Sequence, residues 1–135
     1  MIITGGCRFI GTNIANYYRQ LGYDILNIDI NSPKNGDHQN FLKIDLCQYK
    51  ELEQAILNFG PAIVIHLGAR TDLDSNLSDY NSNIDGVKNL IKVLAQLPDL
   101  ERVIFTSSML VCKPGHIPQN FEDYQPSTVY GESKV

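Results

Sequence analysis

Short apolar runs alternate along this chain with longer segments in which apolar residues recur at helical spacing. The strand-like runs fall at residues 1–4, 24–30, 40–44, 62–67 and 102–106. The helical segments lie between them, at residues 10–21, 52–59 and 87–94. Strands that are linked through crossover helices pair in parallel, so the alternation predicts an α/β fold whose parallel sheet has about five strands.

A glycine-rich turn joins the first predicted strand to the first predicted helix. Gly5, Gly6 and Gly11 leave room for a pyrophosphate to approach the backbone at a helix N-terminus. Asp29 ends the second predicted strand, 18 residues beyond Gly11, where a carboxylate can accept hydrogen bonds from an adenosine ribose. Turn and carboxylate together predict a dinucleotide site. The alternative is a plain strand-to-helix turn in which Asp29 caps a loop.

Length and composition indicate one domain and argue against several kinds of partner. The 135 residues carry a net charge of -4, so we expect no nucleic-acid surface. Cys7, Cys47 and Cys112 lack CxxC spacing, and we expect neither disulfides nor a metal site. The sequence shows no leader and no long apolar run, which predicts a cytoplasmic protein without a membrane partner.

Tyr130 and Lys134 form a second chemical feature, near the end of the sequence. Residues four apart share one helix face, so the ammonium group would favour the phenolate form and prepare the tyrosine for proton transfer. A Y-x-x-x-K pattern by itself is common on ordinary helices. Here it follows the glycine turn, the acidic strand end and a serine after the fifth strand, and this order makes the pattern specific.

These features resemble the extended short-chain dehydrogenase/reductase family, the NAD-dependent epimerases and dehydratases of sugar nucleotides. Thr4, Gly5 and Gly11 match the family's opening T-G-x-x-G-x-x-G, and Arg8 stands at its middle glycine. The resemblance implies a doubly wound, Rossmann-like fold. Residues 1–135 would form an incomplete NAD(P)-binding domain that stops before the C-terminal half and the substrate lobe.

Arg8 is the main departure from the family's phosphate loop. If this position needs a positive φ, arginine strains the loop by about 1 kcal/mol, and its side chain can fill the phosphate channel. Alternatively, the guanidinium pairs with a phosphate of the cofactor, or with the 2′-phosphate of NADP. Asp29 favours NAD over NADP, because its charge would repel that 2′-phosphate. Weak dinucleotide binding is the expectation.

The resemblance implies a larger set of cofactor contacts. Asp45 and Leu46 look like the pair that contacts adenine, and residues 66–69 are similar to an H-L-A-A segment that lines the cofactor. We interpret His66 itself as scaffold. The residues implied to bind the cofactor are Gly5, Gly6, Cys7, Arg8, Phe9, Ile10, Gly11, Asp29, Ile30, Asn31, Asp45, Leu46, Leu67, Gly68, Ala69, Thr71, Asn83, Tyr130 and Lys134.

The implied catalytic residues are Ser108, Tyr130 and Lys134. Residues 126–134 are similar to the family's P-x-x-x-Y-G-x-S-K stretch, and Ser108 matches its catalytic serine or threonine. The resemblance implies that Tyr130 takes a proton from a sugar hydroxyl as NAD accepts hydride, with Lys134 holding the phenolate and ribose. Met109 and Leu110 replace the acidic pair of the dehydratases, which favours epimerisation or reduction.

The short terminal helix raises an expectation about activity. A helix that stops within two turns does not hold itself in water, so we expect Tyr130 and Lys134 to fray and the isolated chain to be inactive. Two classes stay open: an epimerase part that needs a missing segment to act on a nucleotide sugar, and a degenerate, non-catalytic nucleotide-binding or interaction module. An exposed apolar flank would cause association with that C-terminal segment or a homo-oligomer.

Overall fold

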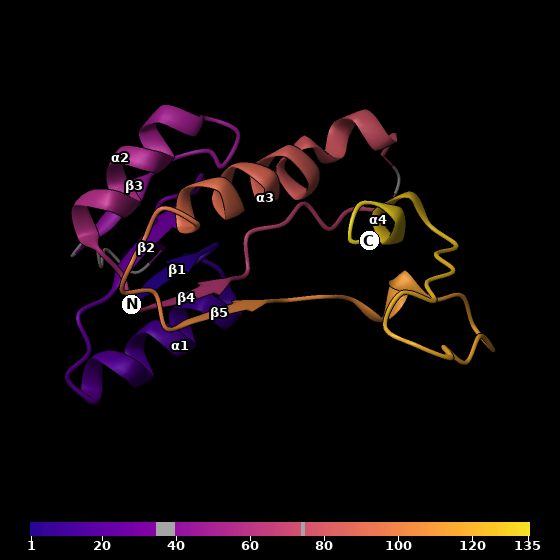
Figure 1. Cartoon of the computed structure of the whole chain (residues 1–135), viewed down its shortest axis with the longest axis horizontal. Helices are drawn as coiled ribbons and strands as arrows, with labels where there is room; N and C mark the ends of the chain where they lie inside the picture. Colours follow the sequence, from indigo (N-terminus) through magenta and orange to yellow (C-terminus); the bar gives the residue numbers. More distant parts are fainter. Residues whose placement is uncertain (35–39, 74) are drawn as a thin grey trace.

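A parallel five-stranded sheet forms the centre of the protein, in a computed structural model that describes residues 1–34, 40–73 and 75–135 (Figure 1). Within these residues the strand order is β3-β2-β1-β4-β5. The strands are β1 (Ile2–Thr4), β2 (Leu26–Asp29), β3 (Phe41–Lys43), β4 (Ile63–His66) and β5 (Arg102–Phe105). The predicted α/β fold and its strands are confirmed, each strand slightly shorter than expected. The turn-forming residues 31–37 also predict a loop after β2, which lies partly outside the described residues.

Helices cover both faces of the sheet, as the crossover connections require. Figure 1 shows α2 and α3 on one face and α1 on the other. Their bounds are α1 (Phe9–Gln20), α2 (Tyr49–Phe59) and α3 (Asn81–Leu94), with the 3₁₀ helix η1 (Leu77–Tyr80) directly before α3. The sequence Gly60-Pro61 predicts the end of α2, and the structure confirms it: Gly60 adopts φ +60° and donates its N–H to the carbonyl of Ile56.

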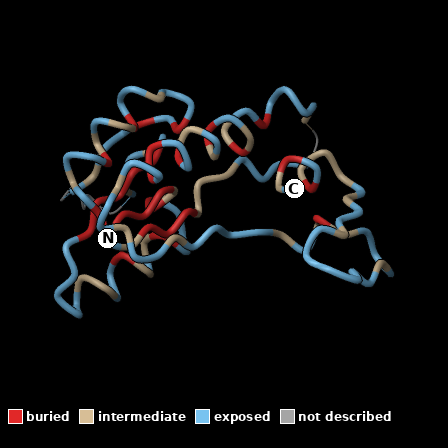
Figure 2. Tube along the Cα trace, viewed as in Figure 1, coloured by how far each residue is buried: buried red, intermediate tan, exposed pale blue. Residues whose placement is uncertain are grey.

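Each central strand buries side chains on both faces, because successive residues of a strand point to opposite sides. Ile2 packs with Leu52 and Leu90 beneath α2 and α3. Its neighbour Ile3 packs with Ala15 against α1. Figure 2 shows this buried material concentrated in the strands and on the inner faces of the helices. The two layers explain why the strands read as nearly continuous apolar runs.

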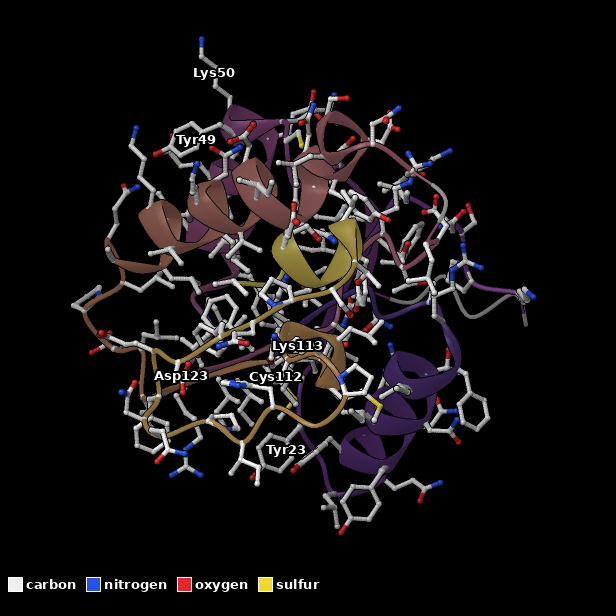
Figure 3. All side chains as sticks on the ribbon, turned by 90° about the vertical axis from the view of Figure 1, so that its right-hand side faces the viewer. Tyr23, Tyr49, Lys50, Cys112, Lys113 and Asp123 are labelled. Atoms are coloured by element: carbon white, nitrogen blue, oxygen red, sulfur yellow. The ribbon has the colours of Figure 1, made fainter. Side chains whose placement is uncertain are left out.

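After β5 the chain leaves the sheet and forms a separate, extended region (Figure 1). It contains the 3₁₀ helix η2 (Met109–Val111) and the short helix α4 (Val129–Glu132). The loop between them is tied together, since Lys113 N donates to Gln125 O at 2.6 Å and His116 Nε2 lies 3.2 Å from a carboxylate oxygen of Asp123 (Figure 3). The three prolines and Gly115 within residues 113–126 predict such a loop, and it is present and held by its own contacts.

Apolar side chains of β5 stay exposed at the edge of the sheet. Ile104 and Phe105 are 45% and 42% exposed. This is the flank on which the expected association with another segment or another copy depends, and that association stays a prediction. In the described part of the chain, no helix combines the length and the apolarity that crossing a bilayer requires.

Candidate cofactor-binding site

The turn between β1 and α1 packs so tightly that its glycines have no space for side chains. Gly5 has φ +70°, and a Cβ built there would lie 2.7 Å from the backbone nitrogen of Gly68. A Cβ on Gly11 would lie 2.6 Å from the Cα of Gly6. The glycines therefore let the first turn of α1, the end of β1 and the exit of β4 meet at the carboxyl edge of the sheet.

Asp29 faces this turn from the end of β2. One carboxylate oxygen accepts the N–H of Cys7 at 3.0 Å, and the other accepts the N–H of Asn31 at 2.9 Å and its side-chain amide at 3.3 Å. Asp29 is only 7% exposed. Its carboxylate therefore ties the glycine turn to the end of β2.

Arg8 has an ordinary backbone conformation, contrary to one expectation from its position. It is the N-cap of α1, with φ -94° and ψ 176°, which is extended backbone that any residue adopts. The strain expected from a positive φ is therefore absent. Its exposed side chain lines two neighbouring cavities, so it borders the turn rather than folding into the core.

The larger cavity, of about 960 Å³, lies at the carboxyl ends of the strands, the ligand-binding edge of open α/β sheets. It gathers most of the residues implied to bind the cofactor. Those lining it are Gly5, Arg8, Asp29, Ile30, Asn31, Asp45, Leu46, Leu67, Gly68, Ala69 and Thr71. A tight glycine turn, a buried carboxylate and an apolar floor fit a dinucleotide with an adenosine end.

Other residues of the implied set lie elsewhere. Gly6, Cys7 and Phe9 line a second cavity together with Arg8, and Phe9 is 84% exposed. Ile10 and Gly11 line neither cavity. Gly11 lies so close to Gly6 that a side chain would not fit, and this lets the first turn of α1 pack against the glycine turn.

Asn83 makes buried hydrogen bonds to two other segments of the chain, and its implied contact with the cofactor stays a prediction. Its amide oxygen accepts the N–H of Arg70 at 2.8 Å, and its amide nitrogen donates to Arg70 O at 3.0 Å and to Ser133 Oγ at 2.8 Å. Asn83 is 5% exposed and lines neither cavity. The side chain thus connects the loop after β4 to the segment that carries Tyr130 and Lys134.

The segment with Tyr130 and Lys134 is held by several contacts outside its own helix. Thr128 caps α4 by accepting the N–H of Gly131 at 2.9 Å, and Ser133 Oγ donates to Tyr130 O at 2.8 Å. The ring centroids of Tyr130 and Tyr80 lie 6.1 Å apart. These contacts add to the few hydrogen bonds of a four-residue helix, and fraying of the segment stays a prediction.

The three implied catalytic residues come together only in part. Lys134 lies in the turn after α4, not on its helical face, because the helix ends at Glu132. Lys134 is half-buried, and burial lowers the pKa of its ammonium group. Ser108 Oγ accepts the N–H of Leu110 at 3.1 Å, and Leu110 O packs against Gly131, so the serine turn and α4 are neighbours.

His66 is buried at the end of β4, as the scaffold interpretation requires. Its Nδ1 lies 2.7 Å from Thr4 Oγ1, and its buried Nε2 has no hydrogen-bond partner among the described residues. Burial, with a smaller effect from the charge of Lys134, lowers the pKa of His66 from 6.5 to about 4. The imidazole is therefore neutral at pH 7.

This burial makes the stability of the protein depend on pH. As the pH falls below about 6.5, His66 takes up a proton in the unfolded chain. In the folded chain it stays neutral down to about pH 4. The free energy of unfolding should therefore fall across this window by about 3 kcal/mol from this residue, and the loss should level off below it. Urea unfolding at several pH values, compared with His66→Gln, measures the effect. Parallel curves for the two proteins would contradict it.

Several residues that line the larger cavity were not part of the implied set. Arg70 is the main one: its guanidinium pairs with Asp72 at 2.6 Å and also contacts Ser75 Oγ at 2.8 Å. Cys47 and Ser82 line the cavity as well. Arg70 directly follows the segment implied to line the cofactor, and that adjacency was the available signal.

Comparison with known proteins identifies the family. The NAD dependent epimerase/dehydratase family matches residues 1–135, the whole chain. The chain belongs to this family. It is similar to a putative UDP-glucose 4-epimerase of Methanocaldococcus jannaschii, 26% identical over 145 residues that cover 99% of this chain and 47% of the relative. It is also similar to CDP-paratose 2-epimerase of Salmonella typhi, 25% identical over 80% of this chain and 36% of the relative.

A solved structure of a family-like enzyme supports the same assignment. The enzyme WbmG of Bordetella bronchiseptica, in complex with NAD, superposes with a TM-score of 0.83 at 25% identity. The superposition covers 98% of this chain and 46% of WbmG. The chain thus spans less than half the length of these relatives.

Proposed function

We propose that this chain is the NAD-binding part of an enzyme that epimerises or reduces a nucleotide sugar. The proposal is carried by the larger cavity, where the glycine turn meets the buried carboxylate of Asp29. Family membership and the NAD complex of WbmG support the cofactor, and the relatives that act on UDP- and CDP-sugars support the substrate class. The absence of acidic side chains at Met109 and Leu110 favours epimerisation or reduction over dehydration.

The fit of the cavity to NAD rests on the residues around it. Gly5 and Gly68 would let the pyrophosphate approach the backbone, since neither carries a side chain into the gap between β1 and β4. Asp29 would hold the adenosine ribose, and Leu46 would form an apolar surface for adenine. Asp29 would also favour NAD over NADP, because its carboxylate can accept hydrogen bonds from the free hydroxyls of the adenosine ribose.

The proposed chemistry gives three side chains different roles around one proton transfer. Tyr130 Oη, as phenolate, takes the proton of a sugar hydroxyl, and the ammonium of Lys134 stabilises that phenolate. Ser108 Oγ already accepts the N–H of Leu110, so its own hydrogen stays available to the reacting oxygen. When bound, NAD supplies the acceptor for the hydride of the same carbon.

Binding of NAD by the 135-residue chain tests this function. We expect a dissociation constant in the micromolar range by titration calorimetry, and about tenfold weaker binding for Asp29→Asn, because the substitution removes the charge that the ribose hydroxyls use. Asp85→Asn is the matched control, since Asp85 is exposed on α3 and its carboxylate lies 3.6 Å from Lys88 Nζ. An Asp29→Asn variant that binds NAD as tightly as the unmodified chain would contradict the assignment.

We further propose that the chain by itself has little or no turnover. The superposition covers 46% of WbmG. The described residues of this chain form the Rossmann-like sheet with its helices and the extension at residues 106–135. A hydride-transfer assay with NAD and a panel of UDP-, GDP- and dTDP-sugars measures this. Substantial turnover by the isolated chain would refute the proposal.

The second candidate function is a non-catalytic nucleotide-binding or interaction module. Two observations favour it: Arg8 stands at the middle glycine of the phosphate loop, and residues 111–113 lack the tyrosine and glycine of the family's V-Y-G ending. No heat of binding with NAD in the same titration would support this class.

A further inference from the structure

Tyr80 packs between the loop after β4 and the segment that carries Tyr130. It is the last residue of η1 and is fully buried, at 0% exposed. η1 packs against α4, toward the right of Figure 1. The ring centroids of Tyr80 and Tyr130 lie 6.1 Å apart with their planes tilted by 43°, a separation that aromatic pairs commonly adopt. Tyr80 therefore provides a packing surface for the ring that is implied to transfer a proton.

Tyr80 is itself held in one orientation by the loop after β4. Its hydroxyl donates to the carbonyl of Asp72, and the guanidinium carbon of Arg70 lies 6.0 Å from the centre of its ring. Arg70 is fixed in turn, because its Nε and Nη2 donate to the two carboxylate oxygens of Asp72 at 2.6 and 3.0 Å. Burial and these two contacts leave the ring of Tyr80 little freedom to turn, so its orientation is determined by the chain itself.

The contact between the two tyrosines orients Tyr130 without occupying its hydroxyl. The hydroxyl of Tyr80 donates to Asp72, so the two side chains meet through their rings. Proton transfer requires the phenol oxygen to stay within hydrogen-bond distance of the substrate, and a half-buried ring that turned freely about χ1 would seldom be there. A fixed neighbouring ring restricts this rotation and leaves the oxygen of Tyr130 to the substrate.

Tyr80 and Asn83 contact the α4 segment at different places. They lie three residues apart at the start of α3, a spacing that puts two side chains on the same side of a helix. Asn83 donates to Ser133 Oγ at 2.8 Å, and that hydroxyl donates to the carbonyl of Tyr130 at 2.8 Å. We propose that Tyr80 is a positioning residue that fixes the ring of Tyr130 for proton transfer, while Asn83 fixes the backbone of the same segment. This inference rests on the proposed function, because only proton transfer requires a fixed phenol.

NMR of the full chain with isotope-labelled tyrosine rings tests the positioning role. The chain has seven tyrosines, and Tyr130→Phe assigns the signals of Tyr130. We expect a nuclear Overhauser cross-peak between the rings of Tyr80 and Tyr130, and Tyr80→Leu should shift the ring signals of Tyr130. Tyr80→Phe should keep those signals, since it retains the ring and loses only the hydroxyl. Tyr18→Leu is the matched control, because it removes a ring that packs against Tyr17 on α1, on the other face of the sheet (Figure 1).

Two further measurements separate positioning of the ring from general support of the fold. Amide exchange at residues 131–133 should change by less than about threefold in Tyr80→Leu, because Asn83 still holds the backbone there. Calorimetry should show NAD binding about threefold weaker in Tyr80→Leu, with adenosine monophosphate binding unchanged, because the monophosphate reaches only the adenosine end of the cavity. A variant that merely lost stability would not divide the two ligands in this way.

The outcomes distinguish this inference from the proposed function. No cross-peak between the rings in the unmodified chain would overturn the positioning role, and so would Tyr130 signals that Tyr80→Phe shifts as much as Tyr80→Leu. Both results are obtained even if Tyr80→Leu does not fold. NAD binding by a chain whose Tyr130 signals do not respond to Tyr80→Leu would overturn the positioning role and leave the proposed function. A cross-peak in a chain that binds no NAD would remove the proposed function and leave the fixed ring.

Discussion

Gly5→Ala should lower the free energy of unfolding by about 3 kcal/mol and weaken NAD binding more than tenfold. Two effects add at this position. The positive φ of +70° costs about 1 kcal/mol for a residue with a Cβ. The Cβ would also lie 2.7 to 2.8 Å from the backbone at Leu67 and Gly68, which has no flexible side chain to move away. The turn must therefore separate from the exit of β4, and the pyrophosphate would lose its place.

Gly60→Ala provides a matched control for the backbone effect alone. Gly60 has φ +60°, and nothing lies within 4 Å of its added Cβ. Its substitution should therefore cost only about 1 kcal/mol and leave NAD binding unchanged. Urea unfolding and calorimetry on both variants measure the difference. Equal losses of stability for Gly5→Ala and Gly60→Ala would show that the close packing of the glycine turn is not what makes Gly5 necessary.

Asn83→Leu should lower the free energy of unfolding by about 3 kcal/mol and expose residues 127–135 to hydrogen exchange. Leucine has a similar size but removes three hydrogen bonds, and it leaves the N–H and carbonyl of Arg70 and the hydroxyl of Ser133 without this partner. Because the four-residue α4 depends on contacts with other elements, exchange in this segment should accelerate by more than tenfold.

Two further variants separate the connection to α4 from general stability. Asn89→Leu on the same helix also removes amide bonds, here to the carbonyls of Leu46 and Cys47, but does not touch α4. It should destabilise the protein without selectively exposing residues 127–135. Ser133→Ala removes the opposite end of the connection and should expose that segment at little cost to β4. If Asn83→Leu and Asn89→Leu change exchange in residues 127–135 equally, Asn83 does not position the segment.

The fold and the larger cavity could be predicted because their signals are local. Apolar periodicity marks strands and helices within a few residues, and a glycine turn with an acidic strand end marks the ligand-binding edge of the sheet. The departures came from contacts between distant residues. Asn83 reaches Ser133 across 50 positions, and Thr4 reaches His66 across 62, and no local pattern reports such a pairing.

Arg8 shows, at a single residue, the same difference between what a local motif predicts and what the packed structure decides. The motif drew attention to this position, but whether an arginine there is strained depends on its φ, and the turn places it in extended backbone at -94°. The motif also could not show that the side chain lies between two cavities, because the second cavity needs α1, β2 and the loop after β2 to be packed together.

The order of strands and helices, the glycine turn and the carboxylate of Asp29 were determined by the sequence itself, since each follows from neighbouring residues and the limited geometry of the backbone. Only the tertiary structure decided which polar groups are paired. Packing satisfied the amide of Asn83, whereas Oδ1 of Asn27 and Nε2 of His66 find no hydrogen-bond partner among the described residues. Burial and hydrogen bonding depend on what the whole fold brings next to a side chain, and that is settled only when the layers close.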